Sequence, residues 1–99
     1  MARIEFAPAV TDDIDRIVDH LLQHDIKDAA ARVQDIICAI DILDRHPLIG
    51  RQVEAGKREL VIGRDARGYV ALYIYVAEID TAFVLALRSQ TEAGYTQQQ

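Results

Sequence analysis

The sequence has very few residues that would cross-link the chain or punctuate it. Among its 99 residues it has one cysteine, no tryptophan, two prolines and five glycines. A single cysteine, Cys38, excludes an internal disulfide, which fits a reducing compartment such as the cytoplasm. The composition is 51% hydrophobic and 27% charged, an ordinary balance for one globular domain of this length, here residues 1–99.

Long apolar runs and excess positive charge are also missing. No stretch of about 18 apolar residues occurs, and no charged segment followed by an apolar one opens the chain, so we expect neither a membrane span nor a secretory signal. Sixteen acidic residues against 11 basic ones give a formal net charge of −5. Proteins that hold nucleic acid chiefly through charge carry a net basic surface, so we expect no sequence-specific nucleic-acid partner.

Apolar periodicity predicts two helices after a short strand. Residues 1–7 alternate as a half-buried strand, and Pro8 suits a first helical turn. Two apolar stripes with helical spacing then follow within residues 8–46, before Pro47. We interpret them as a helical hairpin.

The apolar period changes from 3.6 to 2 after this hairpin. Three strands within residues 57–88, separated by short polar turns, predict an antiparallel meander, and residues 89–99 form a C-terminal tail. The expected fold is therefore α+β with the order β-α-α-β-β-β, in which the helical hairpin packs on one face of a small antiparallel sheet.

The central strand, residues 69–76, offers two faces. The purely apolar set is assigned to the helices: Val70, Leu72, Ile74 and Val76. Tyr69, Tyr73 and Tyr75 then lie on the opposite face. Tyrosine is common in protein interfaces, so these three rings are candidates for a partner-binding surface; the alternative is that they pack on one another and on the chain tail.

Most common catalytic and metal-binding patterns are absent. His20 and His24 are spaced like two metal ligands, but no third ligand is evident, so we expect no metal. Cys38 lies within a predicted helix without a basic neighbour and is expected to be a buried thiol rather than a nucleophile. No glycine-rich phosphate loop follows a strand, so no nucleotide cofactor is expected either.

The remaining candidates are arginines near the rim of the sheet: Arg58, Arg64, Arg67 and Arg88. The antiparallel topology predicts that Arg88 lies near the hairpin of residues 64–67, with Arg58 at the other end. A single site containing all four arginines is therefore not expected.

Four stretches, in this order and spacing, resemble the RelE/ParE superfamily of toxins from bacterial type II toxin–antitoxin systems: PLIGR (47–51), RELVIG (58–63), GYVALYIY (68–75) and LALRSQTEAGY (85–95). The ParE-like (plasmid stabilisation) branch is the nearer match. The resemblance implies a growth-arresting toxin in a hetero-oligomer with a cognate, ParD-like antitoxin. Members of this branch inhibit DNA gyrase, whereas RelE-like members are ribosome-dependent mRNA endonucleases.

The nuclease pattern matches poorly. RelE-like nucleases place an arginine directly after the Gly-Tyr pair, where this chain has Val70, and an arginine or histidine where it has Ser89. Ser89 also departs from the histidine usual in the ParE-like branch. We therefore expect a gyrase inhibitor rather than an enzyme. If the chain were a nuclease, Arg58, Arg88 and Tyr95 would be its catalytic candidates.

The expected contacts follow from this resemblance. Target binding is assigned to Arg64, Arg88 and Tyr95, and antitoxin binding to Tyr69, Tyr73 and Tyr75. A further alternative is an inactive toxin-fold module whose property is binding an antitoxin, since fold does not fix function.

Overall fold

The computed structural model describes residues 1–23, 29–63 and 68–89. Its helices and strands follow the predicted order, with one additional short strand: β1 (Arg3–Phe6), α1 (Pro8–Gln23), α2 (Ala29–Ile40), β2 (Arg51–Gln52), β3 (Arg58–Ile62), β4 (Tyr69–Val76) and β5 (Thr81–Ser89). Short 3-10 helices, η1 (Asp41–Asp44), η2 (Glu54–Gly56) and η4 (Ala77–Ile79), lie between these elements. Within the described ranges no helix is long and apolar enough to cross a membrane.

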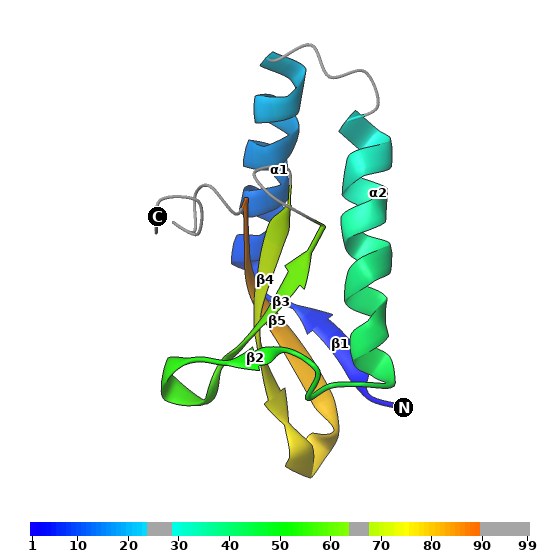
Figure 1. Cartoon of the computed structure of the whole chain (residues 1–99), viewed down its shortest axis with the longest axis vertical. Coiled ribbons are helices and arrows are strands. Elements are labelled where there is room, and N and C mark those ends of the chain that lie inside the picture. Colours follow the sequence, from blue (N-terminus) through cyan, green and yellow to red (C-terminus); the bar gives the residue numbers. More distant parts are fainter. Residues whose placement is uncertain (24–28, 64–67, 90–99) are drawn as a thin grey trace.

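The strands form one mixed sheet in the order β1-β5-β4-β3-β2 (Figure 1). Strands β3, β4 and β5 make the predicted antiparallel meander. The expectation of a wholly antiparallel sheet is wrong at one edge, because β1 runs parallel to β5, with Arg3 opposite Thr81 and Phe6 opposite Val84. The helical hairpin between β1 and the meander makes this parallel pairing possible, since it returns the chain across the sheet.

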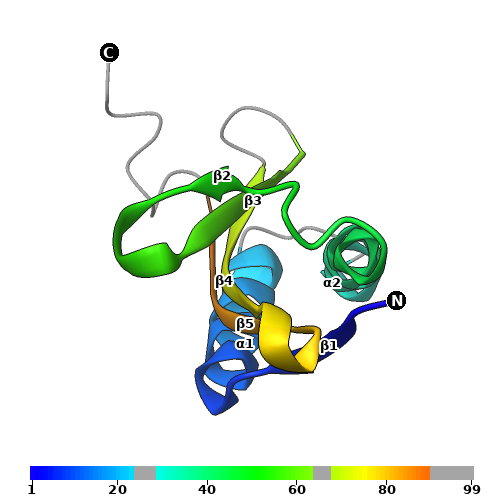
Figure 2. The same ribbon diagram turned by 90° about the horizontal axis from the view of Figure 1, so that it is seen from below.

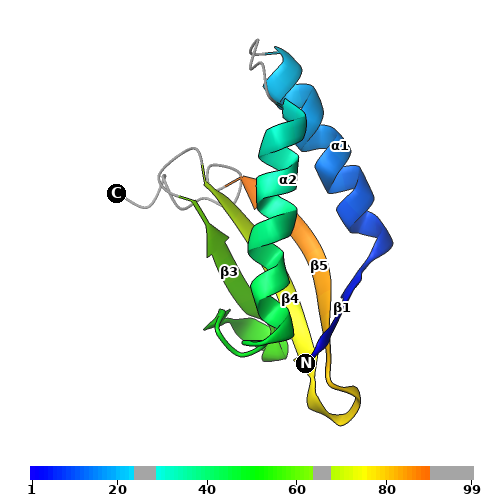
Figure 3. The same ribbon diagram turned by 90° about the vertical axis from the view of Figure 1, so that its right-hand side faces the viewer.

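Both helices cover the same face of the sheet, as Figures 2 and 3 show. Helix α1 packs against β5, and α2 lies against β3. The buried stripe of α1 consists of Val10, Asp13, Ile17 and Leu21, at helical spacing. Burial of this stripe and of its counterpart on α2 holds the hairpin to the sheet.

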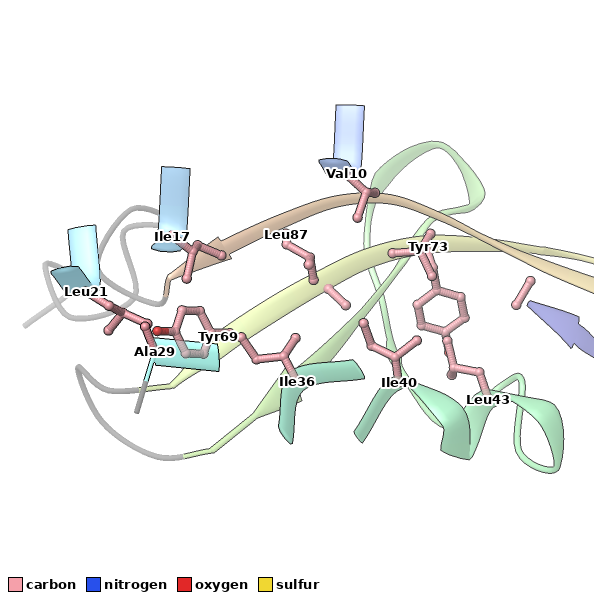
Figure 4. Packing of buried hydrophobic residues seen from close by; sticks show 13 residues of the cluster. Val10, Ile17, Leu21, Ala29, Ile36, Ile40, Leu43, Tyr69, Tyr73 and Leu87 are labelled. Carbon is pink, nitrogen blue, oxygen red and sulfur yellow. The ribbon is translucent and has the colours of Figure 1, made fainter. Parts of the chain in front are cut away.

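The tyrosine face of β4 points into the core, which reverses the assignment made from the sequence. Tyr69 and Ala71 are buried in the main apolar cluster, and Tyr73 is 0% exposed. Figure 4 shows the ring of Tyr73 beside Leu43 and that of Tyr69 toward Ala29. An aromatic ring fills more of the space beneath the helices than a valine does, and its hydroxyl can bond to backbone at the margin of the core.

A bulge in β5 explains the spacing of its buried residues. The register changes between Leu72, opposite Ala86, and Tyr73, opposite Val84, so Leu85 is an extra residue without a partner. Val84 and Leu87 both reach the core as a result, although three positions separate them. An unbulged strand would turn one of them to the other face.

Candidate functional site

A buried carboxylate joins α1 to the end of β5. Asp13 is 6% exposed, and its Oδ2 accepts the backbone N–H of Leu87 at 2.9 Å. Its Oδ1 lies 2.9 Å from Nη1 of Arg16 and 3.5 Å from Nη1 of Arg88. Arg16 also donates from Nη2 to the carbonyl of Leu87 at 3.2 Å. We call Asp13, Arg16, Leu87 and Arg88 the Asp13 cluster.

The Asp13 cluster occupies a sheet edge that β1 leaves open. Strand β1 ends at Phe6, opposite Val84, whereas β5 continues to Ser89. Among the described residues, the backbone N–H and C=O of Leu87 therefore have no neighbouring strand on that side, and Asp13 and Arg16 bond to them instead. Buried backbone groups need such partners, and covering an edge in this way also blocks pairing with another chain.

Arg88, one residue before the end of β5, carries an accessible charge. Its side chain is 50% exposed, and its Nη1 makes a long contact of 3.5 Å with Oδ1 of Asp13. Asp13 faces both Arg16 and Arg88, so one carboxylate is shared between two guanidinium groups. The cluster therefore carries net positive charge at the point where the C-terminal tail begins.

The two described arginines of the predicted group, Arg58 and Arg88, lie apart on the sheet. Arg88 lies opposite Val70 on β4, whereas Arg58 lies opposite Tyr73 from the other side of that strand. Paired residues share a face of the sheet, and positions 70 and 73 point to opposite faces, so the two arginines diverge. Arg58 and Arg88 therefore do not share a site. Arg64, Arg67, Tyr95 and His24 lie outside the described residues, so the prediction for the four arginines together stays a prediction.

Arg58 and Tyr73 together hold the loop of residues 47–50, which we call the 47–50 loop. The hydroxyl of Tyr73 donates to the carbonyl of Pro47 at 2.8 Å and accepts the N–H of Gly50 at 2.9 Å. Nη1 of Arg58 donates to the carbonyls of Leu48 and Gly50, at 3.0 and 2.8 Å. Two side chains from neighbouring strands thus fix most of the polar backbone of this loop.

Gly50 is required here for space rather than for backbone conformation. A Cβ atom at this position would lie 2.6 Å from both Cε1 and the hydroxyl of Tyr73, and 3.0 Å from the carbonyl oxygen of Glu59. Only glycine lets the loop approach the ring so closely. Burial raises the pKa of Tyr73, and the N–H of Gly50 and the positive charge of Arg58 oppose that rise.

Tyr75 has a different environment from the other two tyrosines of β4. It packs against the edge of the core, and its hydroxyl donates to the carboxylate of Asp80. That hydrogen bond is the main cause of its raised pKa. Tyr69 and Tyr73 are buried, so exposure no longer supports the prediction that they bind an antitoxin; only Tyr75 remains partly accessible.

Asp13 and the role of Tyr73 were missed from the sequence, although a signal existed for each. Asp13 sits at helical spacing with Val10 and Ile17 and so belongs to the buried stripe, where an acid demands partners. For Tyr73 the signal was indirect: Pro47 and Gly50 mark a tight loop that needs backbone partners, but they lie 26 and 23 positions from Tyr73 in the chain. In the described ranges no group of three potential metal ligands occurs, and Cys38 is exposed rather than buried as predicted.

Comparison with known proteins identifies the family of this chain. A family model described as "ParE toxin of type II toxin-antitoxin system, parDE" matches residues 4–94. The chain therefore belongs to the ParE toxin family.

A solved structure, titled "Chromosomal ParDE TA system from P. aeruginosa", is similar in fold, with a TM-score of 0.73 over 90% of this chain and 96% of that chain. The two sequences are 22% identical. Comparison with curated proteins gave no match.

Proposed function

We propose that this chain is a growth-arresting toxin that inhibits DNA gyrase and is held inactive by a cognate antitoxin. The observation that carries the proposal is the ParE toxin family match over residues 4–94. The similar solved structure is described as a ParDE toxin–antitoxin system, which supports an antitoxin partner of the same kind here.

The positions of the candidate nuclease residues favour inhibition over RNA cleavage. Cleavage at a 2′-hydroxyl needs a base, an acid and cations around one phosphate. Val70, which stands where RelE-like nucleases place an arginine, is 3% exposed. Arg58 is engaged with loop carbonyls and points away from the face of Arg88. These two arginines would not reach one phosphate without rearrangement of the sheet.

Target contact is assigned to the end of β5. Arg88 is half-exposed and its contact with Asp13 is long, at 3.5 Å, so its guanidinium is accessible to a carboxylate on the target. Arg64 and Tyr95 are proposed to act with it, because the hairpin and tail that carry them adjoin this end of the sheet in the chain. Antitoxin contact is assigned to Tyr75.

The proposal is tested by inducing the chain alone in a bacterial host and pulse-labelling DNA and protein synthesis within the first minutes. Thymidine incorporation should fall first, and purified gyrase should lose supercoiling activity in the presence of the chain. Earlier loss of amino-acid incorporation would overturn the proposal in favour of a ribosome-dependent nuclease. Normal growth would favour an inactive antitoxin-binding module.

The contact residues are tested separately. An Arg88→Ala and Tyr95→Ala double variant should arrest growth more weakly than the wild type while keeping its circular dichroism spectrum. Full toxicity of that variant would remove the end of β5 from the target interface. Asp12→Ala, an exposed charge change on α1, serves as the control.

A further inference from the structure

The 47–50 loop displays two large apolar side chains in water. Leu48 is 57% exposed and Ile49 is 52% exposed. Single exposed apolar residues are common on protein surfaces and need no explanation. This pair differs because the backbone of its loop makes four hydrogen bonds with the side chains of Tyr73 and Arg58.

The hydrogen bonds keep the loop in one conformation before any partner arrives. They engage the carbonyls of Pro47, Leu48 and Gly50 and the N–H of Gly50. Ordering a loop on binding opposes affinity, and a loop already ordered avoids that cost. The hydrogen bonds of Tyr73 and Arg58 therefore hold Leu48 and Ile49 at the surface, where both side chains stay exposed.

The surroundings of this pair are basic, in contrast to the rest of the chain. Residues 45–59 contain four basic residues, Arg45, Arg51, Lys57 and Arg58, and two acids, Glu54 and Glu59, for a formal charge of +2. Glu59 is ion-paired with Arg51, and since the whole chain carries −5, the remaining residues carry −7. Arg58 bonds to neutral carbonyl oxygens and has no ion pair with a described residue. Its charge therefore remains available to the surface.

We infer that the 47–50 loop is a second docking element for the protein on which this toxin acts, in addition to Arg88. Leu48 and Ile49 protrude, so they require a preformed apolar pocket, which a folded target supplies. A segment that folds on binding brings its own apolar side chains and needs a groove on the toxin instead. The basic surroundings require acidic residues around that pocket. This inference rests on the proposed gyrase target.

The test uses the full chain and purified DNA gyrase holoenzyme. A double variant, Leu48→Ser with Ile49→Ser, is compared with a matched control, Leu22→Ser with Ile79→Ser, whose side chains are 61% and 58% exposed. Both affinity for gyrase and inhibition of supercoiling are measured. The loop variant should be weakened about 10- to 100-fold, as for central apolar anchors of an interface. The control should stay within about threefold of the wild type, as for near-neutral positions outside the interface.

Three other outcomes would overturn the inference, and each can be told from the others. Equal inhibition by the loop variant and the wild type would remove the loop from the interface and leave the gyrase proposal standing. Failure of the wild type to bind gyrase would remove both. Weaker binding of the loop variant to the antitoxin encoded beside the toxin, with gyrase binding unchanged, would assign the loop to the antitoxin. Unchanged thermal unfolding of both variants shows that the effects arise at the surface.

Discussion

Asp13 reaches from α1 to fix the backbone of Leu87, whereas Tyr73 reaches from β4 to fix the 47–50 loop. In both regions a polar group at the margin of the core bonds to backbone groups that are not paired with any strand the structure describes. The surfaces that result differ. The Asp13 cluster presents a charged guanidinium, and the 47–50 loop presents two apolar side chains.

The difference is one of physical mechanism. The Asp13 cluster depends on a carboxylate shared between two half-exposed arginines, so its stability responds to charge and to salt. The hydroxyl of Tyr73 makes neutral hydrogen bonds in a tightly packed site, so the loop responds to volume and to proton loss. Each region can therefore be disturbed without the other, and four predictions use that independence.

The largest expected effect is at Asp13. Asp13→Ala leaves the N–H of Leu87 without its acceptor and both arginines without their carboxylate, which should lower the free energy of unfolding by about 3 kcal/mol. Asp15→Ala, an exposed change on the same helix, should cost less than about 0.5 kcal/mol. Urea denaturation measures both. Equal costs would show that the buried carboxylate contributes no more than any surface acid.

The order of the helices and strands could be predicted from the sequence, whereas several details of the core and of the sheet edge could not. Alternation and helical spacing predict the elements and their order, because hydrophobic period follows secondary structure directly. They do not decide which face of β4 meets the helices, since Tyr73 is apolar enough for the core and polar enough for the surface. They also miss the bulge at Leu85, which depends on the register between β4 and β5, and the bond of Asp13 to Leu87, which depends on where β1 ends beside β5.

The second-largest loss of folding stability is expected for Gly50→Ala. In Gly50→Ala the new Cβ would overlap the buried ring of Tyr73, which cannot swing aside, so a loss of about 2 kcal/mol is expected. The loss should shrink only in part in a Tyr73→Phe background, because the hydroxyl contact is gone but the 2.6 Å approach to Cε1 remains, and a double-mutant cycle measures that coupling. A cycle that shows additive costs would mean that the loop and the ring are energetically independent.

A smaller loss is expected for Tyr73→Phe. The ring stays in the core, but the N–H of Gly50 loses its acceptor and the carbonyl of Pro47 its donor, at a cost of about 1 kcal/mol. Amide hydrogen exchange should quicken at Gly50 and remain unchanged at Leu87. Faster exchange at Leu87 as well would show that the two regions are coupled rather than independent.

The smallest effect appears only at alkaline pH. Burial raises the pKa of Tyr73 above its ordinary value near 10, so the native state keeps a proton that the unfolded state releases. The stability from this group is complete below about pH 10 and is lost as the pH rises through the native pKa. The unfolding free energy of the wild type should therefore fall more steeply above pH 10 than that of Tyr73→Phe, and denaturation between pH 8 and 11.5 measures the gap. Tyr75 keeps its hydrogen bond to Asp80 in both proteins, so its titration contributes equally to the two curves. Parallel curves would mean that the hydroxyl of Tyr73 titrates as if it were in water.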